Sequence, residues 1–121
     1  MKISFDFDNT LSRNKVQNVA MILKNQGHEI IIVTSRRTSG CGIKFDNTDL
    51  FVVAENLGIK DIIFTEGQDK VEFLKNKKVD IHIDDDRFEL ELLKGTKIKP
   101  IQVNGSFWIK KLFSETLQKY I

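Results

Sequence analysis

The sequence predicts an α/β fold in which a five-stranded parallel sheet is covered by helices on both faces. Short apolar runs alternate along the chain with segments whose apolar residues recur at helical spacing, as in strands joined by crossover helices. Residues 29–34 also contain an unbroken run of branched apolar side chains, which is typical of a central strand buried on both faces. At 121 residues the chain has the length of one domain, so we expect a single domain over residues 1–121.

The individual elements follow from side-chain periodicity. Residues 2–8 alternate between apolar and polar, which predicts a strand. Apolar residues from Val16 to Leu23 recur at intervals of three and four and predict a helix that stops at Gly27. Asp69 and Glu72 have the spacing of a capping box, so we expect a short helix over 69–77 to begin there.

The other elements are assigned by the same two periods. We expect a strand over 29–34, a helix over 50–57 that ends at Gly58, strands over 61–65, 79–84 and 98–103, a helix over 88–93, and a final helix that starts near Ser106 and includes Tyr120. Residues 36–48 fit neither period and are rich in Gly, Ser, Thr and Asn, which predicts an irregular surface loop.

Composition and charge argue against several classes of protein. The net charge is only +2, so charge alone gives no general attraction to nucleic acid. No apolar run approaches the ~20 residues of a membrane span, and the first residues lack the apolar core of a signal peptide. The single cysteine, Cys41, cannot form an internal disulfide, which fits a reducing compartment. We therefore expect a cytoplasmic protein without a membrane partner.

Two carboxylates end the first predicted strand. In an extended chain Asp6 and Asp8 point to one side, while Phe5 and Phe7 point to the other. Like charges this close are costly unless a cation or a proton relieves them, so the pair indicates a metal site, an acid/base couple, or both. The plain structural alternative is a polar strand face that ends in a turn.

Further polar residues follow the other predicted strands. They are Thr34 and Ser35 after the second strand, Lys70 in the segment after the third, and Asp84, Asp85 and Asp86 at the end of the fourth. In such a sheet, ligands bind beyond the carboxyl ends of the strands, near the point where the strand order reverses. We therefore expect these residues to share one site with Asp6 and Asp8.

These residues occur in an order that resembles the haloacid dehalogenase superfamily of phosphohydrolases. The resemblance covers nearly the whole chain and rests on four motifs: Asp6-Phe7-Asp8-Asn9-Thr10, then Thr34, Lys70 and Asp84-Asp85. It implies a Rossmann-like catalytic domain that hydrolyses phosphomonoesters through an aspartyl phosphate. Lys70 competes for its role with Lys75, Lys77 and Lys78, which otherwise suit a solvated helix surface.

The residues themselves suit phosphoryl transfer. Asp6 can attack phosphorus, the role that the resemblance also gives it, and Asp8 can protonate the leaving oxygen and then deprotonate water. Thr34 and Lys70 can neutralise the phosphoryl oxygens. The remaining phosphate or substrate contacts are assigned to the backbone N–H groups around Asn9 and Thr10 and to Ser35 and Arg36.

A hard divalent cation with oxygen ligands fits the acids, so we expect Mg²⁺. Asp6 and the backbone carbonyl of Asp8 supply two ligands. In relatives the second acid of the fourth motif usually points at the metal. The third ligand is therefore drawn, in order of preference, from Asp85, Asp84, Asp86 and Glu89.

The expected substrate follows from what the chain lacks. Neither position at which relatives insert a cap domain has room for one, so the chain resembles the capless branch. Members of that branch take large phosphorylated substrates, such as nucleic-acid ends or phosphoproteins, or form homo-oligomers in which a neighbour supplies the lid. Arg36, Arg37 and Lys44 near the mouth of the site favour nucleotide or polynucleotide-end phosphates.

Two other classes of function stay open. One is a phosphoacceptor signalling domain, although that family carries its phosphorylated Asp after the third strand, where this chain has Phe64-Thr65-Glu66. The other is a catalytically silent binding module that keeps the fold.

Overall fold

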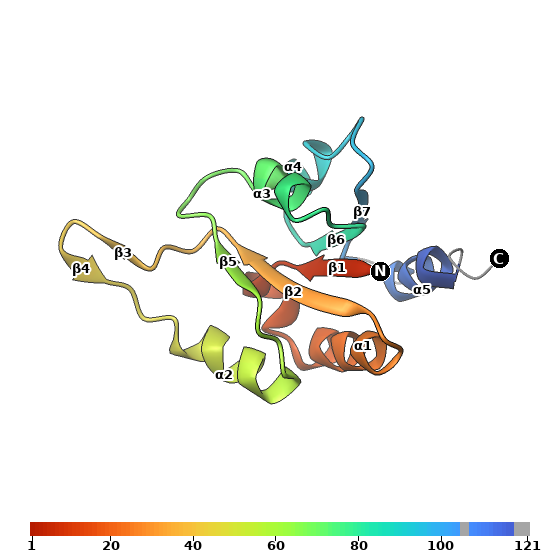
Figure 1. Ribbon diagram of the computed structural model, residues 1–121, viewed down its shortest axis with the longest axis horizontal. Coiled ribbons are helices and arrows are strands. Elements are labelled where there is room, and N and C mark those ends of the chain that lie inside the picture. The colour runs from red at the N-terminus through yellow and green to blue at the C-terminus, as the bar shows by residue number, and fades with distance from the viewer. Residues whose placement is uncertain (105–106, 118–121) are drawn as a thin grey trace.

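The central sheet contains five parallel strands in the order β5-β2-β1-β6-β7 (Figure 1). The computed structural model describes residues 1–104 and 107–117. The strands are β1 (Lys2–Phe5), β2 (Glu29–Thr34), β5 (Ile62–Phe64), β6 (Ile81–Asp84) and β7 (Lys99–Gln102). Phe5 of β1 aligns with Ile32 of β2 and with Ile83 of β6, so β1 lies at the centre of the sheet.

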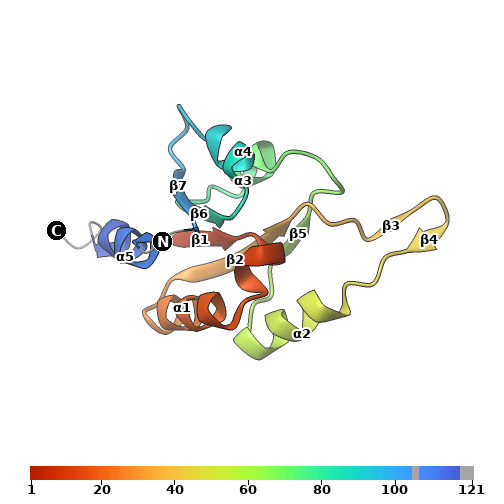
Figure 2. The ribbon, with the colours of Figure 1, turned by 180° about the vertical axis from the view of Figure 1, so that it is seen from behind.

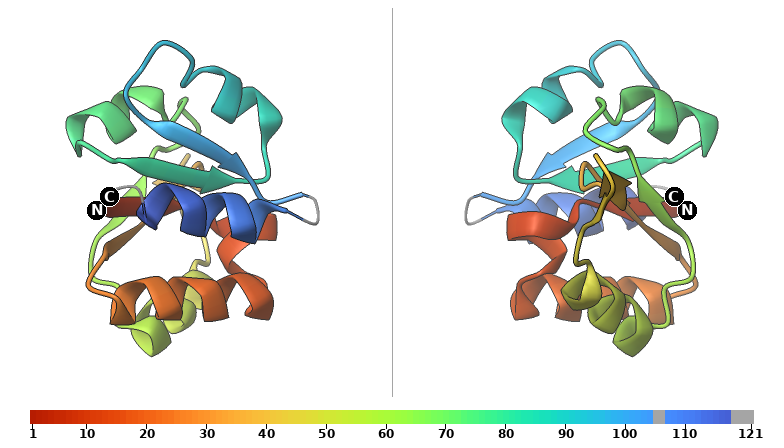
Figure 3. Two further views of the ribbon diagram at one scale, coloured as in Figure 1. Left: turned by 90° about the vertical axis from the view of Figure 1, so that its right-hand side faces the viewer. Right: turned by 90° about the vertical axis from the view of Figure 1, so that its left-hand side faces the viewer.

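Helices cover both faces of this sheet, as the views in Figure 3 show. One face is covered by α1 (Asn14–Asn25), α2 (Thr48–Leu57) and α5 (Trp108–Leu117), and the other by α3 (Val71–Asn76) and α4 (Arg87–Glu91). The predicted α/β, Rossmann-like fold with a five-stranded parallel sheet is therefore confirmed. None of the described helices is both long and apolar enough to cross a membrane.

The apolar core is divided between the two faces in the way that the strand period requires. Ile30 and Ile32 pack into the layer beneath α1 and α2, whereas Ile31 and Val33 pack into the layer beneath α3 and α4. The unbroken apolar run of the second predicted strand is thus buried on both sides. The expected final helix is α5, but its proposed start at Ser106 and its residue Tyr120 lie outside the described residues.

The first strand is shorter than its alternating sequence suggests. It ends at Phe5, and the chain then enters the tight turn η1 (Phe7–Leu11), in which Asn9 has a φ of 57°. The amide of Asp6 still donates to the carbonyl of Ile83, so the turn begins one residue beyond the ladder. Phe7 nevertheless stays in the core, and Asp6 keeps to the opposite side, as predicted.

Residues 39–44, within the predicted loop of residues 36–48, form a short hairpin. The segment lies at the surface as predicted, but it is not irregular throughout. The strands β3 (Ser39–Gly40) and β4 (Ile43–Lys44) are antiparallel, and Cys41 and Gly42 between them have φ values of 51° and 76°. Two positive φ values suit the twist of a two-residue hairpin. Figures 1 and 2 show the hairpin extending away from the body, beyond the carboxyl ends of the strands.

The start of α3 also differs from the prediction. The helix begins at Val71 rather than at Asp69, and no side chain caps it in the manner of a capping box. Instead, the carboxylate of Glu89 accepts the backbone N–H of Lys70 at 3.0 Å. A tertiary contact between segments 19 residues apart therefore replaces the local cap.

The hairpin should contribute little to stability because it has few buried groups, with Ile43 at its tip 61% exposed. We expect replacement of residues 39–44 by a short Gly-containing link to change the free energy of unfolding by less than about 1 kcal/mol. Ile32→Ala, in the fully buried centre of β2, should cost about 2–5 kcal/mol. Urea unfolding of both variants measures this, and comparable losses would show that the hairpin belongs to the cooperative core.

Candidate active site

The acidic residues meet where the strand order reverses. The chain passes from β1 to β2 and β5 on one side, and β6 and β7 then add to the other side of β1. Adjacent loops diverge at the carboxyl ends of β1 and β6, and a cleft between such loops is where ligands bind in open α/β sheets. Asp6 follows β1 directly and Asp84 ends β6, so the pairing of two central strands brings these carboxylates together.

Three carboxylates form a compact cluster at this point. One oxygen from each of Asp6, Asp84 and Asp85 can be chosen such that all three lie within 4.8 Å of one another. Asp6 is 5% exposed, Asp84 is fully buried, and Asp85 is half-buried. The cluster borders a hollow of about 390 Å³, whose other lining residues are Asp8, Asn9, Ser35, Lys70, Asp86 and Arg87.

Lys70 supplies the positive charge of the cluster. Its Nζ donates to Asp6 Oδ1 at 2.8 Å and to Asp84 Oδ2 at 2.7 Å, and the side chain is 3% exposed. Burial alone would lower the pKa of Lys70, but the two carboxylates outweigh it and raise the pKa. The competing lysines lie elsewhere: Lys75 pairs with Glu72, and Lys77 pairs with Asp61.

The pKa values of the two acids that bind Lys70 are shifted in opposite directions. Burial raises the pKa of Asp6 to about 8, despite the opposing charge of Lys70, and the negative charge of Asp84 adds to the effect. Burial also acts to raise the pKa of Asp84, but hydrogen bonding from His82 and the charge of Lys70 reverse the shift and lower it. Two neighbouring acids with separated pKa values are characteristic of catalytic sites.

Thr10 connects the acids at the base of the hollow. Its hydroxyl lies 3.2 Å from Asp6 Oδ2 and 3.3 Å from Asp85 Oδ1, and it is fully buried. A hydroxyl carries one proton, so Thr10 can donate to one of these oxygens at a time. The sequence predicted a phosphate contact from the Thr10 backbone and did not foresee this side-chain role.

Asp8 borders the acidic hollow and binds Arg36. Arg36 Nη2 donates to Asp8 Oδ1 at 2.7 Å and Nε to Oδ2 at 3.0 Å, while Nη1 and Nη2 donate to Asp49 of α2. The hydrogen bond to Asp49 is the largest cause of a raised pKa of Arg36, and the hydrogen bond to Asp8 is the next largest. The guanidinium also lies 4.9 Å from the centre of the Phe7 ring. Arg36 therefore links η1 to α2 at the rim of the hollow.

Thr34 and Ser35 take different positions at the end of β2. Thr34 is fully buried, and its hydroxyl accepts the backbone N–H of Arg36 at 3.2 Å. Ser35 borders the acidic hollow and also a second hollow of about 370 Å³, which is lined by Arg36, Arg37, Phe45, Asp46 and Asn47. Ser35, rather than Thr34, is thus the residue of this pair that borders the hollow.

The acids at and after the end of β6 differ in how many hydrogen bonds their carboxylate oxygens accept. Asp84 Oδ1 accepts the backbone N–H of Asp86, and its Oδ2 accepts from Lys70 and His82. Asp86 caps α4 through the N–H of Phe88. Among the described residues, Asp85 receives a hydrogen bond only from Thr10, and Asp85, unlike Asp86, lies in the cluster with Asp6 and Asp84. Asp85 therefore combines available oxygens with a place beside the other acids.

The supporting roles of two residues were not predicted from the sequence. Glu89, there a remote candidate for a metal ligand, holds the Lys70 backbone. His82, there interpreted as an ordinary strand-face residue, donates to Asp84 from the same face of β6. The alternating pattern of residues 79–84 places His82 and Asp84 on the same face of the strand, so the sequence did contain a signal for the contact of His82 with Asp84. The contact of Glu89 with Lys70 could not be found without the tertiary structure.

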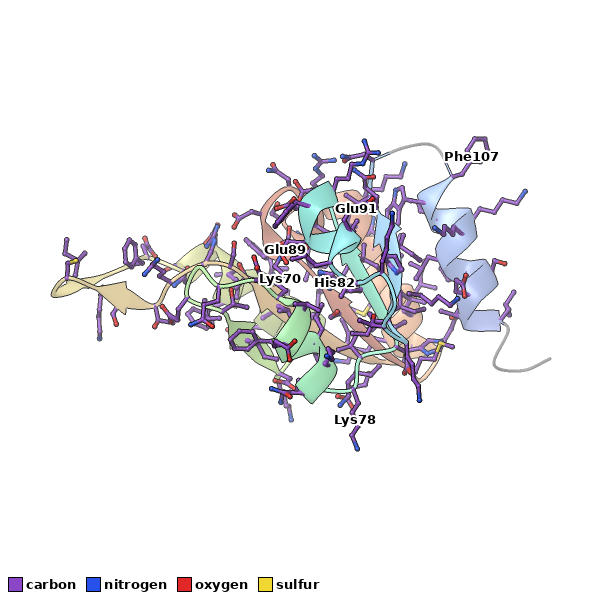
Figure 4. The ribbon with its side chains drawn as sticks, turned by 90° about the horizontal axis from the view of Figure 1, so that it is seen from above. Lys70, Lys78, His82, Glu89, Glu91 and Phe107 are labelled. Atoms are coloured by element: carbon purple, nitrogen blue, oxygen red, sulfur yellow. The ribbon has the colours of Figure 1, made fainter. Side chains whose placement is uncertain are left out.

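A larger hollow lies at the opposite end of the sheet. It has a volume of about 590 Å³ and is bordered by Lys75, Lys78, Val79 and Ile98, among others. Figure 4 shows Lys78 at the edge of the molecule, well separated from Lys70. The described residues that line this hollow include no cluster of buried acids around a buried lysine. The size of a hollow alone therefore does not identify the reactive site.

Comparison with known proteins adds support for the fold alone. No protein-family model matches the chain, and no curated protein matches its sequence. The structure is similar to the crystal structure of an uncharacterized protein from Corynebacterium glutamicum, with a TM-score of 0.64 and 9% sequence identity. The match covers 97% of this chain and 92% of that chain, so the whole architecture is shared.

The raised pKa of Asp6 predicts a pH dependence of stability. Between its ordinary value of 3.8 and about 8, the folded state retains a proton that the unfolded chain has lost, so stability falls as the pH rises. Asp6→Asn removes this titration. In chelator, we expect the unfolding free energy of the wild type to decline more steeply than that of Asp6→Asn, by up to about 1.4 kcal/mol per pH unit.

Urea unfolding at a series of pH values tests this difference in slope. Asp61→Asn is the matched control because Asp61 forms a partly exposed ion pair with Lys77, outside the site. That control should keep the wild-type slope. Parallel slopes for the wild type and Asp6→Asn would show that the pKa of Asp6 is not raised.

Proposed function

We propose that the protein is a Mg²⁺-dependent phosphomonoester hydrolase of the capless haloacid dehalogenase type. The observation that carries the proposal is the buried arrangement of Asp6, Lys70 and Asp84, with Asp85 beside them at the mouth of a hollow. A carboxylate nucleophile beside a fixed ammonium group fits the transfer of an anionic phosphoryl group. The motif order in the sequence gives independent support.

In the proposed reaction Asp6 is the nucleophile. Its oxygen forms a bond to phosphorus while the bond from phosphorus to the ester oxygen breaks, and the leaving oxygen receives a proton from Asp8. Asp8 then takes a proton from water as that water attacks the aspartyl phosphate. Inorganic phosphate leaves and Asp6 is restored. Lys70 neutralises charge on the phosphoryl oxygens, and Ser35 can donate a hydrogen bond at the same opening.

The role of Asp8 requires a change of partner. Its carboxylate is held by Arg36 in the described conformation. An incoming phosphate ester offers Arg36 another anion. Asp8, released from Arg36, takes up a proton from solvent and turns toward the leaving oxygen, while Arg36 remains paired with Asp49 and binds substrate.

The donor set fits Mg²⁺. Carboxylate oxygens from Asp6 and Asp85, with the backbone carbonyl of Asp8, are the hard ligands that this cation prefers, and the open hollow leaves room for water. When bound, the cation keeps Asp6 ionised and neutralises charge on the phosphoryl group. Asp84 contributes mainly by holding Lys70, because its oxygens already accept three hydrogen bonds.

We propose nucleotides or polynucleotide ends as the substrate class. The second hollow adjoins the acidic one at Ser35 and is lined by Arg37 and the half-exposed Phe45, residue types that suit a further phosphate and a base. A panel of phosphate esters with 3′- and 5′-phosphorylated oligonucleotides tests this choice. Sedimentation with and without substrate tests whether a second copy closes the site.

The nucleophile can be tested directly. We expect Asp6→Asn to abolish hydrolysis of p-nitrophenyl phosphate because the amide keeps the shape of the side chain but cannot attack phosphorus. Circular dichroism should show a folded variant, and Asp61→Asn should keep the wild-type rate. A folded Asp6→Asn with substantial activity would exclude Asp6 as the nucleophile. A wild type that accumulates a stable aspartyl phosphate without turnover would indicate a phosphoacceptor domain instead.

Metal removal gives a second test. Activity should disappear in excess chelator and return with Mg²⁺, whereas Ca²⁺, which is larger and less strictly octahedral, should restore little. Asp85→Asn should raise the Mg²⁺ concentration needed for half-maximal activity more than Asp84→Asn does, since Asp85 has the freer oxygens. Full activity in chelator would contradict the metal requirement, and the reverse ranking would make Asp84 the principal ligand.

A further inference from the structure

We propose that His82, oriented by Ser4, is a positioning residue that fixes Asp84 and thereby places Lys70 against Asp6. The inference rests on the proposed function, in which Lys70 and Asp6 act on the phosphoryl group. Neither His82 nor Ser4 borders the acidic hollow, so any effect on the reaction must pass through Asp84.

The proposal starts from the pairing of the two central strands. Ser4 of β1 and His82 of β6 are aligned neighbours, and both side chains are fully buried. Ser4 Oγ lies 2.7 Å from His82 Nδ1, and His82 Nε2 lies 2.9 Å from Asp84 Oδ2. Figure 4 shows His82 on β6 beneath the region that carries Lys70 and Glu89.

The direction of these hydrogen bonds is set by the available protons. Asp84 Oδ2 accepts from Lys70 Nζ, so this oxygen is an acceptor and His82 donates to it from Nε2. In the tautomer that carries its proton on Nε2, Nδ1 is an acceptor, and the Ser4 hydroxyl 2.7 Å away donates to it. The alternative acceptor for that hydroxyl, the carbonyl of Ile81, is 3.4 Å away and therefore weaker. Asp84 thus sets the tautomer of His82, and the hydrogen bond from Ser4 holds the ring in place.

One carboxylate oxygen joins the hydrogen bonds of His82 to those of Lys70. Asp84 Oδ2 accepts from both His82 Nε2 and Lys70 Nζ, and Lys70 Nζ also donates to Asp6 Oδ1. A continuous series of short contacts therefore runs from Ser4 to the proposed nucleophile. If His82 no longer donates, Asp84 can rotate, and the Lys70 ammonium loses its fixed distance from Asp6.

The position of the dyad supports a role beyond packing. Ser4 and His82 occupy the face of the sheet that α3 and α4 cover with apolar side chains such as Leu74 and Leu90. Buried polar groups weaken such a layer unless they are hydrogen-bonded, and an apolar pair would fill it without this requirement. The final acceptor of the dyad is Asp84, which binds the site lysine.

The test compares His82→Leu with His82→Gln in the full chain, assayed with p-nitrophenyl phosphate at saturating Mg²⁺. Leucine fills the space but cannot donate, whereas the glutamine amide can reach Asp84 from the position of Nε2. We expect kcat of His82→Leu to fall about 10–100-fold with KM changed less than about threefold, and His82→Gln to recover most of the loss. Ser4→Ala should give a smaller fall, since the donor remains.

Thr116→Val is the matched control, because Thr116 is also buried and, within the part of the chain that the structure describes, its hydroxyl donates only to the Phe113 carbonyl in α5. It should keep the wild-type kcat. Equal rates for His82→Leu and the wild type would overturn the proposal. Equal losses in folded His82→Leu and His82→Gln would overturn it too, since the donor would then be irrelevant. Should His82→Leu fail to fold, His82→Met, which also lacks a donor, takes its place, and a wild-type kcat in folded His82→Met would overturn the proposal.

A second readout separates this proposal from the proposed function. The buried, hydrogen-bonded Lys70 ammonium should give a slowly exchanging ¹H–¹⁵N signal, identified by its loss in Lys70→Met. We expect that signal to shift or broaden in His82→Leu and to be unchanged in Thr116→Val. If the wild type hydrolyses no ester, the proposed function fails while this coupling still tests the link from His82 to Lys70. An unchanged signal in folded His82→Leu would reject the link.

Discussion

The buried ion pairs of Lys70 with Asp6 and Asp84 are the interaction on which the site depends. Three clustered carboxylates would repel one another strongly in a region of low dielectric, and Lys70 is the buried cation among them. Burial raises the pKa of Asp6, and the negative charge of Asp84 adds to this effect against the opposing charge of Lys70. The cluster as a whole keeps a net negative charge, which favours binding of a divalent cation. The clustered, buried charges that would serve the proposed reaction therefore lower the stability of the folded protein.

The topology makes this cluster feasible. Asp6 and Asp84 are far apart in the chain, yet the direct pairing of β1 with β6 places both at one edge of the sheet. The same pairing aligns Ser4 with His82 behind them, so a row of polar contacts crosses an otherwise apolar layer. Glu89 adds a bond to the Lys70 backbone from the next helix. The lysine is thus held at both its main chain and its side chain.

The outer rim is organised around a second cation. Arg36 bridges Asp8 in η1 and Asp49 in α2, immediately before the hairpin that extends past the carboxyl ends of the strands. The inner cation is fixed and buried, whereas this outer one is partly exposed and can exchange one anion for another. In the proposed reaction, substrate binding and the release of Asp8 would therefore be coupled at Arg36 without disturbing Lys70.

Local patterns in the sequence were sufficient for the α/β fold and for the candidate acids, because alternation and helical spacing record which side chains are buried. They also placed Lys70, as a motif residue, at the end of the sheet. The partners were decided by tertiary structure: the bond from His82 to Asp84, the bond from Glu89 to the Lys70 backbone, and the engagement of Asp8 by Arg36. Each depends on the pairing or packing of distant segments, and a one-dimensional period carries no information about such contacts.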